Sequence, residues 1–253
     1  MAEQRDRRKP SPRALKEAED VAGSTASMNR RLVRRSPLFW GLERQVRRCL
    51  TRRHGRSSAR AIVREARERF DALLPEVPDI GGTRNRLTPF LLWSAWFLAL
   101  WEVMRRRGAT TDEVGSIVVE AVPRQLAQFP RPLLRWMGRW RMGLTASRLR
   151  EASKRSLERR YAADWVSRFV PGDGEEFAFG IDYVECGICK LYQQKGASEL
   201  VPWLCWLDYT LSDALGLGLK RTKTLGQGAD RCDFRYSPGR ETRWGPPPEP
   251  RRP

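Results

Sequence analysis

A long apolar run in the first half of the chain limits what the chain can fold into. Residues 87–101 contain no charged side chain, and arginines at 105–107 and Gly108 follow shortly after. A helix that crosses a bilayer needs roughly twenty apolar residues, and this run has about fifteen. Because the run is apolar on every side of a helix, we expect it to be the buried central helix of a helical bundle, and we predict no membrane span.

Helix caps and breakers divide the residues around this run into further helices. Ser36 followed by Pro37 is a typical helix start. Gly55 predicts a break between two helices, and Pro123 predicts a helix end. We therefore expect a helical scaffold over residues 30–172. Its predicted helices span residues 37–50, 57–73, 88–104, 110–123, 130–143 and 145–170.

Trp136 and Trp140 lie four residues apart and therefore share one face of the predicted helix over 130–143. Paired aromatic side chains on one helix face are typical of a helix that packs into a core. A stacking platform for nucleic-acid bases would present the same pattern. We expect both tryptophans in the core and keep base stacking as the alternative.

The chain changes character near residue 173. Residues 173–236 contain ten Asp/Glu and seven Lys/Arg, so this segment has a net charge of −3 within a chain of net charge +18. We predict an α+β fold, in which a mostly helical bundle packs against a small C-terminal α/β unit, residues 173–236, with a short sheet. The elements predicted in this unit are a strand at 177–183, helices at 189–194 and 200–215, and strands at 219–225 and 231–236.

Both ends of the chain are polar. Residues 1–29 are rich in charge, Ala, Ser and Pro, and residues 237–253 are rich in proline, so we predict two disordered tails. Sixteen Lys/Arg against six Asp/Glu within residues 1–56 place much of the positive charge near the N-terminus. Such a region can bind nucleic acid or an anionic surface, but no recognised nucleic-acid-binding motif accompanies it. We therefore favour a solvated basic extension, and we leave the oligomeric state open.

The cysteines limit the chemistry and indicate a compartment. Their number, five, is odd, and no apolar signal-peptide segment follows the charged N-terminus, so we expect reduced thiols in a cytoplasmic protein. The last four cysteines follow the spacing C-x2-C-x15-C-x26-C, which lacks the second close pair of a typical zinc site. His54 is the only histidine and lies far from them in sequence. We therefore expect no metal and no other cofactor, and assign acid–base chemistry to carboxylates, thiols, Tyr or Lys.

Two cysteines have a carboxylate close by in sequence. Cys205 and Asp208 are three residues apart and share one face of the predicted helix, which places a thiol beside a carboxylate. Cys232 and Asp233 are adjacent in a predicted strand, so their side chains point to opposite faces of the sheet. We expect Cys186 to join them, so that these thiols and Asp208 converge on one pocket between the C-terminal unit and the bundle. The alternative is that the thiols are dispersed packing residues, because free cysteine behaves as a small hydrophobic side chain.

The same region resembles a known family. The segments YVECG, LVPWLCWLDYTLS and LKRTKTLGQGADRCDFRY, between residues 183 and 236, are similar to the C-terminal motifs of the L-2-amino-thiazoline-4-carboxylic acid hydrolase family. In that family a Cys follows an aromatic strand, an L-C-x-x-D helix comes next, and R-T-x-T, a glycine and C-D-F-R complete the pattern. A looser similarity extends upstream through GGTRNRLTPFLLWSAWFLALWEVMRRRG, and Cys189 is not part of the pattern.

The resemblance implies a hydrolase that opens a small cyclic isothiourea or amidine, such as 2-amino-thiazoline-4-carboxylate, to N-carbamoyl-cysteine. Water attacks the ring carbon between sulfur and nitrogen, and the carbon–sulfur bond opens. Asp208 would activate the water, or Cys186 would attack first and form a covalent adduct, and the sequence does not distinguish these roles. Arg221 would bind the substrate carboxylate. The candidate site residues are, for catalysis, Cys186, Asp208 and Cys205, and, for substrate binding, Cys232, Asp233, Arg221, Thr224 and Asp182.

Two other functions stay open. The order of strand, helix and hairpin is also similar to the small-molecule-binding domain of the 4-vinyl reductase type, which implies a non-catalytic binding or sensor domain on the same scaffold. The arginines allow a binder of anionic surfaces. Turnover of the thiazoline would separate an enzyme from a sensor, and steep salt dependence of binding would indicate the surface binder.

Overall fold

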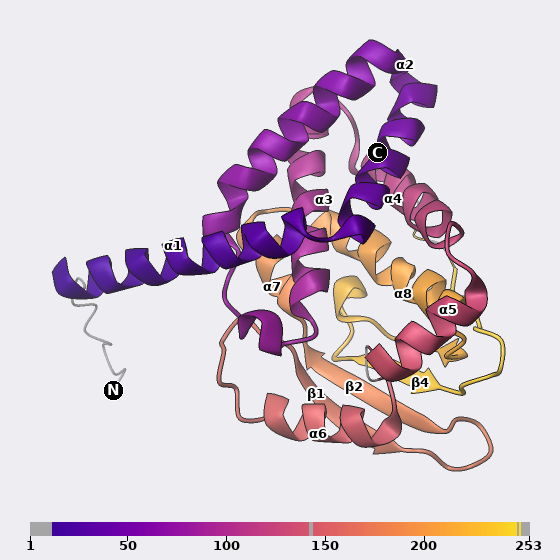
Figure 1. The fold of residues 1–253 in the computed structure, drawn as a ribbon. Coiled ribbons are helices and arrows are strands. Elements are labelled where there is room, and N and C mark those ends of the chain that lie inside the picture. The colour runs from indigo at the N-terminus through magenta and orange to yellow at the C-terminus, as the bar shows by residue number, and fades with distance from the viewer. Residues whose placement is uncertain (1–11, 142–143, 247, 249–253) are drawn as a thin grey trace.

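The computed structural model describes residues 12–141, 144–246 and 248, and it places a helical body beside a small sheet (Figure 1). The expected α+β class, mostly helical with a short sheet, is confirmed. The helices are α1 (Pro12–Arg34), α2 (Pro37–Leu73), α3 (Thr88–Arg106), α4 (Thr111–Leu126), α5 (Arg131–Trp136), α6 (Ala146–Ser156), α7 (Gly187–Gln194) and α8 (Val201–Leu215). The strands are β1 (Val166–Pro171), β2 (Phe179–Glu185), β3 (Leu219–Lys220) and β4 (Cys232–Tyr236).

The apolar run forms α3, which lies at the centre of the helical body (Figure 1). Helices α2, α4 and α7 pack against it. Leu98, Ala99 and Leu100 are fully buried, and they occupy three successive directions around the helix, so α3 is enclosed on all sides at this level. The expected central buried helix is therefore present. Among the described residues, no helix combines the length and the hydropathy that crossing a bilayer requires.

Gly55 and Pro123 have different effects on their helices. Gly55 has a φ of +79°, which L side chains rarely adopt, and it bends α2 sharply, so the predicted break is confirmed. Helix α4 instead continues through Pro123 to Leu126, so the predicted helix end is wrong. Proline removes one backbone hydrogen bond near the end of α4, and the buried face that contains Ile117 and Val118 offsets that loss.

The segment after α5 differs from its prediction. Helix α6 ends at Ser156, and Val166–Pro171 forms strand β1, so the prediction of one helix over residues 145–170 is wrong in its second half. Val166 and Phe169 favour a strand, and β2 supplies the pairing partner that a strand needs. The sheet thus begins within the range that we assigned to the helical scaffold.

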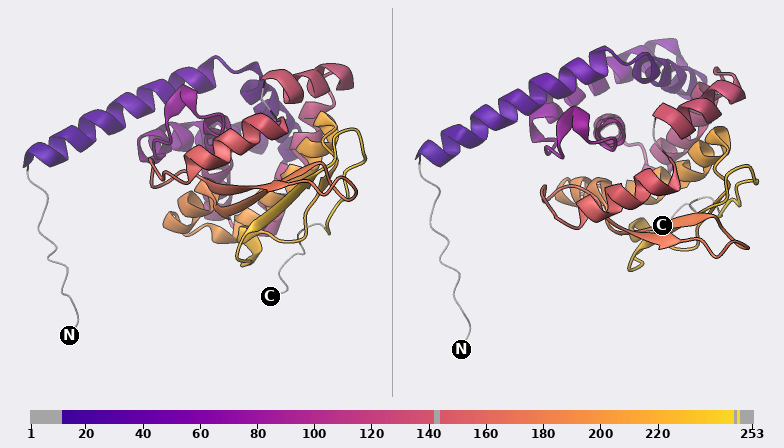
Figure 2. Two further views of the ribbon diagram at one scale, coloured as in Figure 1. Left: turned by 90° about the horizontal axis from the view of Figure 1, so that it is seen from below. Right: turned by 60° about the horizontal axis from the view of Figure 1, so that its bottom comes forward.

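The sheet has the strand order β1-β2-β4-β3, and neighbouring strands are antiparallel. Ile181 pairs with Phe234, and Tyr183 pairs with Cys232. These side chains project to one side, which we call the inner face, where α6 and α8 pack on them. Figure 2 shows α6 lying across this face. The opposite side is the outer face, to which Asp182 and Asp233 belong.

The prediction of disorder over residues 1–29 is wrong for residues 12–29, which form most of α1. Residues 1–11 lie outside the described residues. The second half of α1 packs on the body through Ala26, Asn29 and Val33, which are buried. The first half extends away from the body (Figures 1 and 2). The spacings of three and four residues between the buried side chains are those of an amphipathic helix.

Part of the predicted C-terminal tail also packs on the body. The backbone N–H of Arg243 donates to a carbonyl of β3 at 2.8 Å. The ring of Trp244 lies 5.1 Å from the ring of Trp206 in α8. The prediction of disorder is therefore wrong for residues 237–246, and the rest of the tail, apart from residue 248, lies outside the described residues.

Trp136 and Trp140 are 55% and 59% exposed, so their predicted placement in the core is wrong. Leu134 is buried, and a Cβ added to Gly138 would lie 3.1 Å from Leu215 of α8. Leu134 and Gly138 therefore form the side of this segment that faces the body. The two tryptophans alternate with them along the chain and face outward. Periodicity placed the tryptophans on a common face, but the partner helix determined which face is buried.

Candidate functional site

The inner face of the sheet and two helices bring together the thiols and the carboxylate that the sequence singles out. Cys186 directly precedes α7, and Cys232 begins β4. Cys205 and Asp208 lie about one turn apart on α8. The charge of Asp208 and the thiols of Cys186 and Cys232 all act on the pKa of Cys205, so the groups lie within electrostatic reach of one another. We call these four residues the Cys–Asp cluster.

Arg221 holds Asp208 in place. Its Nη1 donates to Oδ2 of Asp208 at 2.5 Å, and its Nη2 donates to the carbonyl of Cys205 at 2.9 Å. Its guanidinium lies 4.7 and 5.1 Å from the ring centres of Tyr209 and Phe234, and its side chain is 3% exposed. Burial alone would lower the pKa of Arg221, but the charge of Asp208 raises it above its ordinary value. Because so little of the guanidinium is accessible, these contacts favour a positioning role over the predicted binding of a substrate carboxylate.

Asp208 is partly accessible although its surroundings disfavour its charge. Burial raises the pKa of Asp208, and the charge of Arg221 and its hydrogen bond lower that pKa by less. The side chain is nevertheless 39% exposed. The carboxylate is therefore reachable from solvent although its surroundings desolvate it. A carboxylate with a raised pKa is better matched to accepting and returning a proton near neutral pH.

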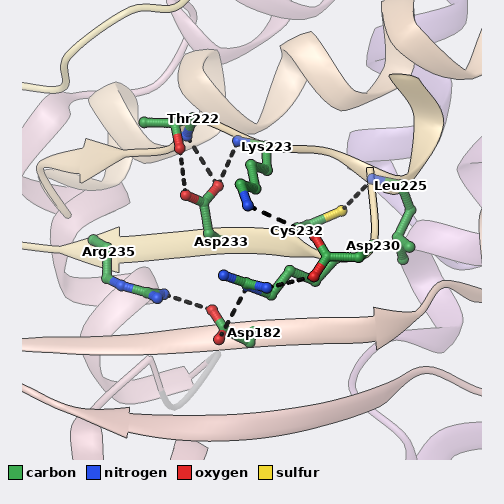
Figure 3. Close-up of polar contacts among 9 residues, drawn as sticks. Asp182, Thr222, Lys223, Leu225, Asp230, Cys232, Asp233 and Arg235 are labelled. Carbon is green, nitrogen blue, oxygen red and sulfur yellow. Dashed lines mark hydrogen bonds and ion pairs between the residues drawn. The ribbon is translucent and has the colours of Figure 1, made fainter. Parts of the chain in front are cut away.

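The three thiols of the cluster stay protonated at neutral pH. A hydrogen bond with the thiol of Cys189, together with burial, raises the pKa of Cys186 well above its ordinary value. Burial has the same effect on the pKa of Cys205 and raises the pKa of Cys232 to about 12. The backbone N–H of Leu225 donates to the sulfur of Cys232 at 3.2 Å (Figure 3). Because the thiolate is the nucleophilic form, these shifts disfavour covalent attack by a cysteine.

An open cavity of about 740 Å³ adjoins the cluster. Its walls are the loop over residues 80–87, helix α6 with the residues that follow it, and the inner face of β1 and β2. Tyr183 lines this cavity. Burial raises the pKa of Tyr183 to about 12, and the charges of Arg86 and Asp208 act on the same hydroxyl. Tyr183 therefore marks the boundary between the cavity and the Cys–Asp cluster.

Asp182 and Asp233 project from the outer face of the sheet (Figure 3). Asp233 accepts hydrogen bonds from the backbone N–H groups of Thr222 and Lys223 at 2.9 and 2.5 Å, and from the hydroxyl of Thr222 at 2.6 Å. Asp182 accepts from Nη1 of Arg235 at 2.7 Å. The structure therefore does not bring these two predicted site residues into the cluster. Their contacts stabilise the sheet and the segment beside β4.

Thr224 shapes a turn that packs against the cluster. Its hydroxyl accepts from the backbone N–H of Gln227 at 3.2 Å and donates to the side-chain oxygen of Gln227 at 2.9 Å. A Cβ added to Gly226 in this turn would lie 3.0 Å from Sγ of Cys205. Thr224 is buried, and its contacts support the turn that packs against Cys205.

The structure does not assemble these side chains as a metal site. Among the described residues, no group of three or more His, Cys, Asp or Glu side chains could hold a metal ion. In the single histidine, His54, Nε2 instead lies 2.9 Å from Oε1 of Glu113 in α4. The cluster offers a carboxylate and three protonated thiols, and Tyr183 beside it adds a partly buried phenol.

Sequence reasoning missed Tyr183 and the arginines of the cavity. Tyr183 stands opposite Cys232 in the register of β2 and β4. Alternation within the predicted strand at 177–183 could have placed Tyr183 on the same face of the sheet as Ile181. Arg148 and Arg155 are seven residues apart and share a face of α6, which is a weak signal in an arginine-rich chain. Arg86 lies in a loop, and no sequence pattern directs it to the site.

A family model described as L-2-amino-thiazoline-4-carboxylic acid hydrolase matches residues 90–236. This range covers more than half of the chain, and it contains the Cys–Asp cluster, Tyr183 and Arg221. No curated protein and no solved structure gives a significant match. The resemblance carried by the C-terminal motifs is thereby confirmed, and the chain belongs to the L-2-amino-thiazoline-4-carboxylic acid hydrolase family.

Proposed function

We propose that the chain hydrolyses 2-amino-thiazoline-4-carboxylate, or a closely related cyclic isothiourea or amidine, with Asp208 as the general base. Membership of the family supports a hydrolase for this substrate. The single observation that carries the residue assignment is the carboxylate of Asp208, which is accessible although burial raises its pKa. A base of this kind is matched to proton transfer near neutral pH.

In the proposed reaction, Asp208 takes a proton from water as the water oxygen bonds to the ring carbon between sulfur and nitrogen. The hydroxyl proton of the tetrahedral intermediate passes to the ring nitrogen. The carbon–sulfur bond breaks, and the departing sulfur receives the proton that Asp208 holds. The former ring carbon becomes a urea carbonyl, so the product is N-carbamoyl-cysteine, and one water is consumed for each ring opened.

The residues around Asp208 support this base in two ways. Arg221 engages Oδ2 and so fixes the carboxylate, which can then accept a proton from water through its other oxygen. Tyr183, whose pKa of about 12 keeps its hydroxyl protonated, can donate a hydrogen bond to the intermediate. The thiols of Cys186, Cys205 and Cys232 then line the site as neutral, polarisable groups beside the sulfur-containing ring.

The competing mechanism uses Cys186 as a nucleophile. It requires a thiolate, and the raised pKa of Cys186 makes that form scarce. Under the proposed mechanism, Cys186→Ser should keep most of the activity, because serine preserves the size of the side chain. A loss of about a thousandfold or more in Cys186→Ser, with the fold intact, would assign the chemistry to the thiol.

The proposal is tested by incubating the purified protein with 2-amino-thiazoline-4-carboxylate. N-carbamoyl-cysteine carries a free thiol, so its formation is followed with a thiol-reactive chromophore and its mass is confirmed by mass spectrometry. Opening of the carbon–nitrogen bond would instead give the S-carbamoyl isomer, which has no free thiol. Binding without turnover would favour the sensor function, and absence of both would overturn the proposal.

A further inference from the structure

The cavity beside Tyr183 has a strongly basic lining. Three carboxylates accompany the arginines, so the net formal charge of the lining is +3. Glu158 pairs with Arg160, which is itself part of the lining, whereas Glu151 pairs with Lys154 and Asp164 accepts from Asn85. The arginines that line the cavity are Arg84, Arg86, Arg148, Arg155, Arg159 and Arg160.

Two of these arginines act on a third, Arg86. Arg86 comes from the loop over residues 80–87, whereas Arg148 and Arg155 come from one face of α6. Burial lowers the pKa of Arg86, and the positive charges of Arg155 and Arg148 lower it further. Among the ion pairs of the described residues, none joins Arg148 or Arg155 to a carboxylate. Like charges held around an open space are an arrangement that a bound anion stabilises.

We propose that this cavity binds the acidic tail of a substrate that carries at least two negative charges. Arg86, Arg148 and Arg155 surround that tail, and the reacting ring lies past Tyr183, next to Asp208. The position of the ring rests on the proposed hydrolase function, whereas the binding of the anion stands on the cavity alone. The natural substrate is then a larger, polyanionic relative of the thiazoline carboxylate.

Size and charge both favour a ligand larger than the thiazoline. A volume of about 740 Å³ lies in the upper part of the range of about 300–1,000 Å³ for small-molecule sites. A single five-membered ring with one carboxylate would leave most of that space to water. One arginine suffices to bind one carboxylate with two hydrogen bonds, so three arginines suit a phosphate or a pair of carboxylates. Arg221, the predicted partner of the ring carboxylate, is already engaged by Asp208.

The test measures anion binding directly by isothermal titration calorimetry at fixed ionic strength. Citrate and pyrophosphate serve as polyanionic probes, and acetate serves as the monoanion. We expect the polyanions to bind the wild-type protein and acetate not to bind measurably. Arg148→Met and Arg155→Met should each weaken binding by about tenfold or more, because each removes a hydrogen bond between charged groups. Arg168→Met is the matched control, since Arg168 is exposed on the outer side of β1 and its loss changes net charge equally.

The inference fails if the polyanions do not bind the wild-type protein, and two further outcomes also overturn it. Equal weakening in Arg168→Met would show that the net charge of the chain, and not the cavity, attracts the probes. Acetate binding as tightly as citrate would show that a single negative charge is sufficient. Melting temperatures of the three variants check that each is folded, and all three arginines are exposed enough for methionine to be tolerated.

Hydrolase activity separates this inference from the proposed function. Citrate and the thiazoline ring are assigned to neighbouring positions, so citrate binding is measured by calorimetry and thiazoline turnover by thiol release. If the probes bind through Arg148 and Arg155 but the thiazoline is not turned over, the proposed function fails and the anion site stands. If the thiazoline is turned over and the probes do not bind, the anion site fails and the proposed function stands.

Discussion

Asp208 and Asp233 lie on the two sides of the same sheet, and their surroundings have opposite effects on them. Asp233, on the outer side, accepts three hydrogen bonds from Thr222 and Lys223. Burial would raise the pKa of Asp233, but these hydrogen bonds outweigh it and lower the pKa. Asp208, on the inner side, accepts from Arg221, and there burial outweighs the pair and raises the pKa.

The difference shows that the number of hydrogen-bond donors around a carboxylate distinguishes one with a structural role from one that can transfer a proton. Solvent exposure does not distinguish the two kinds of carboxylate. The side chain of Asp182, a second carboxylate on the outer face, is 19% exposed, which is less than the 39% of Asp208. A carboxylate whose lone pairs are satisfied anchors a segment and has little affinity for a proton. A carboxylate short of donors in desolvating surroundings keeps an oxygen for water and holds a proton more readily.

The largest expected effect is on activity. Asp208→Asn should lower kcat/KM for the thiazoline by about a hundredfold to ten-thousandfold, because it removes the proposed base. Asp233→Asn, the matched control on the outer face, should lower it by less than about tenfold, since the side chain of Asp233 accepts its hydrogen bonds from the segment beside β4. Rates of thiol release measure both, and circular dichroism checks the fold. Similar losses of activity in the two variants would show that the face of the sheet on which a carboxylate lies does not determine its role.

The paired positions of thiol and carboxylate could be predicted from the sequence because they depend on local periodicity. Cys205 and Asp208 are three apart in a helix, and Cys232 and Asp233 are adjacent in a strand, so chain geometry alone separates the inner from the outer side. The same holds for α3, where an uncharged run of this length has to be buried. In each case the decisive information lies within one element.

The features that sequence could not predict depend on a partner element. Val166–Pro171 becomes a strand because β2 is available beside it. Trp244 packs on the body because Trp206 of α8 lies beside it. Trp136 is exposed because the opposite side of its helical segment, which contains Gly138, packs against Leu215. The cavity likewise combines a loop, a helix and a sheet, so no single stretch of sequence contains its arginines in order.

The next largest effect is on stability, and it compares the ion pairs on the two faces. Arg221→Met should lower the free energy of unfolding by about 3 kcal/mol, the low end for breaking a buried ion pair, because Asp208 keeps partial exposure. Arg235→Met, which removes one of the two arginines that pair with Asp182 on the outer face and leaves Arg231 in place, should cost about 1 kcal/mol or less. Urea unfolding measures both. A larger cost for Arg235→Met would place the more important pair on the outer face.

A smaller effect concerns the support of the inner side by the C-terminal segment. Trp244 lies against Trp206 and Tyr209 in α8, and the ring of Tyr209 also carries the guanidinium of Arg221. Trp244→Ala should therefore lower the free energy of unfolding by about 1 kcal/mol. Trp136→Ala, at a tryptophan that is 55% exposed, is the control and should change it by less than about 0.5 kcal/mol. Equal costs would mean that the segment does not support α8.

The smallest expected effect is a separation of two acid transitions. Because burial raises the pKa of Asp208, kcat/KM should fall with decreasing pH around a value above the ordinary carboxyl pKa of 3.8. The pKa of Asp233 is lowered, so the stability it contributes is complete above 3.8 and is lost only as the pH falls through its lower folded value. On acidification, activity should therefore decline while the stability difference between the wild type and Asp233→Asn is still complete. A pH–rate profile and chemical unfolding across the same pH range measure the two transitions, and their coincidence would show that the two carboxylates do not differ in the way their contacts require.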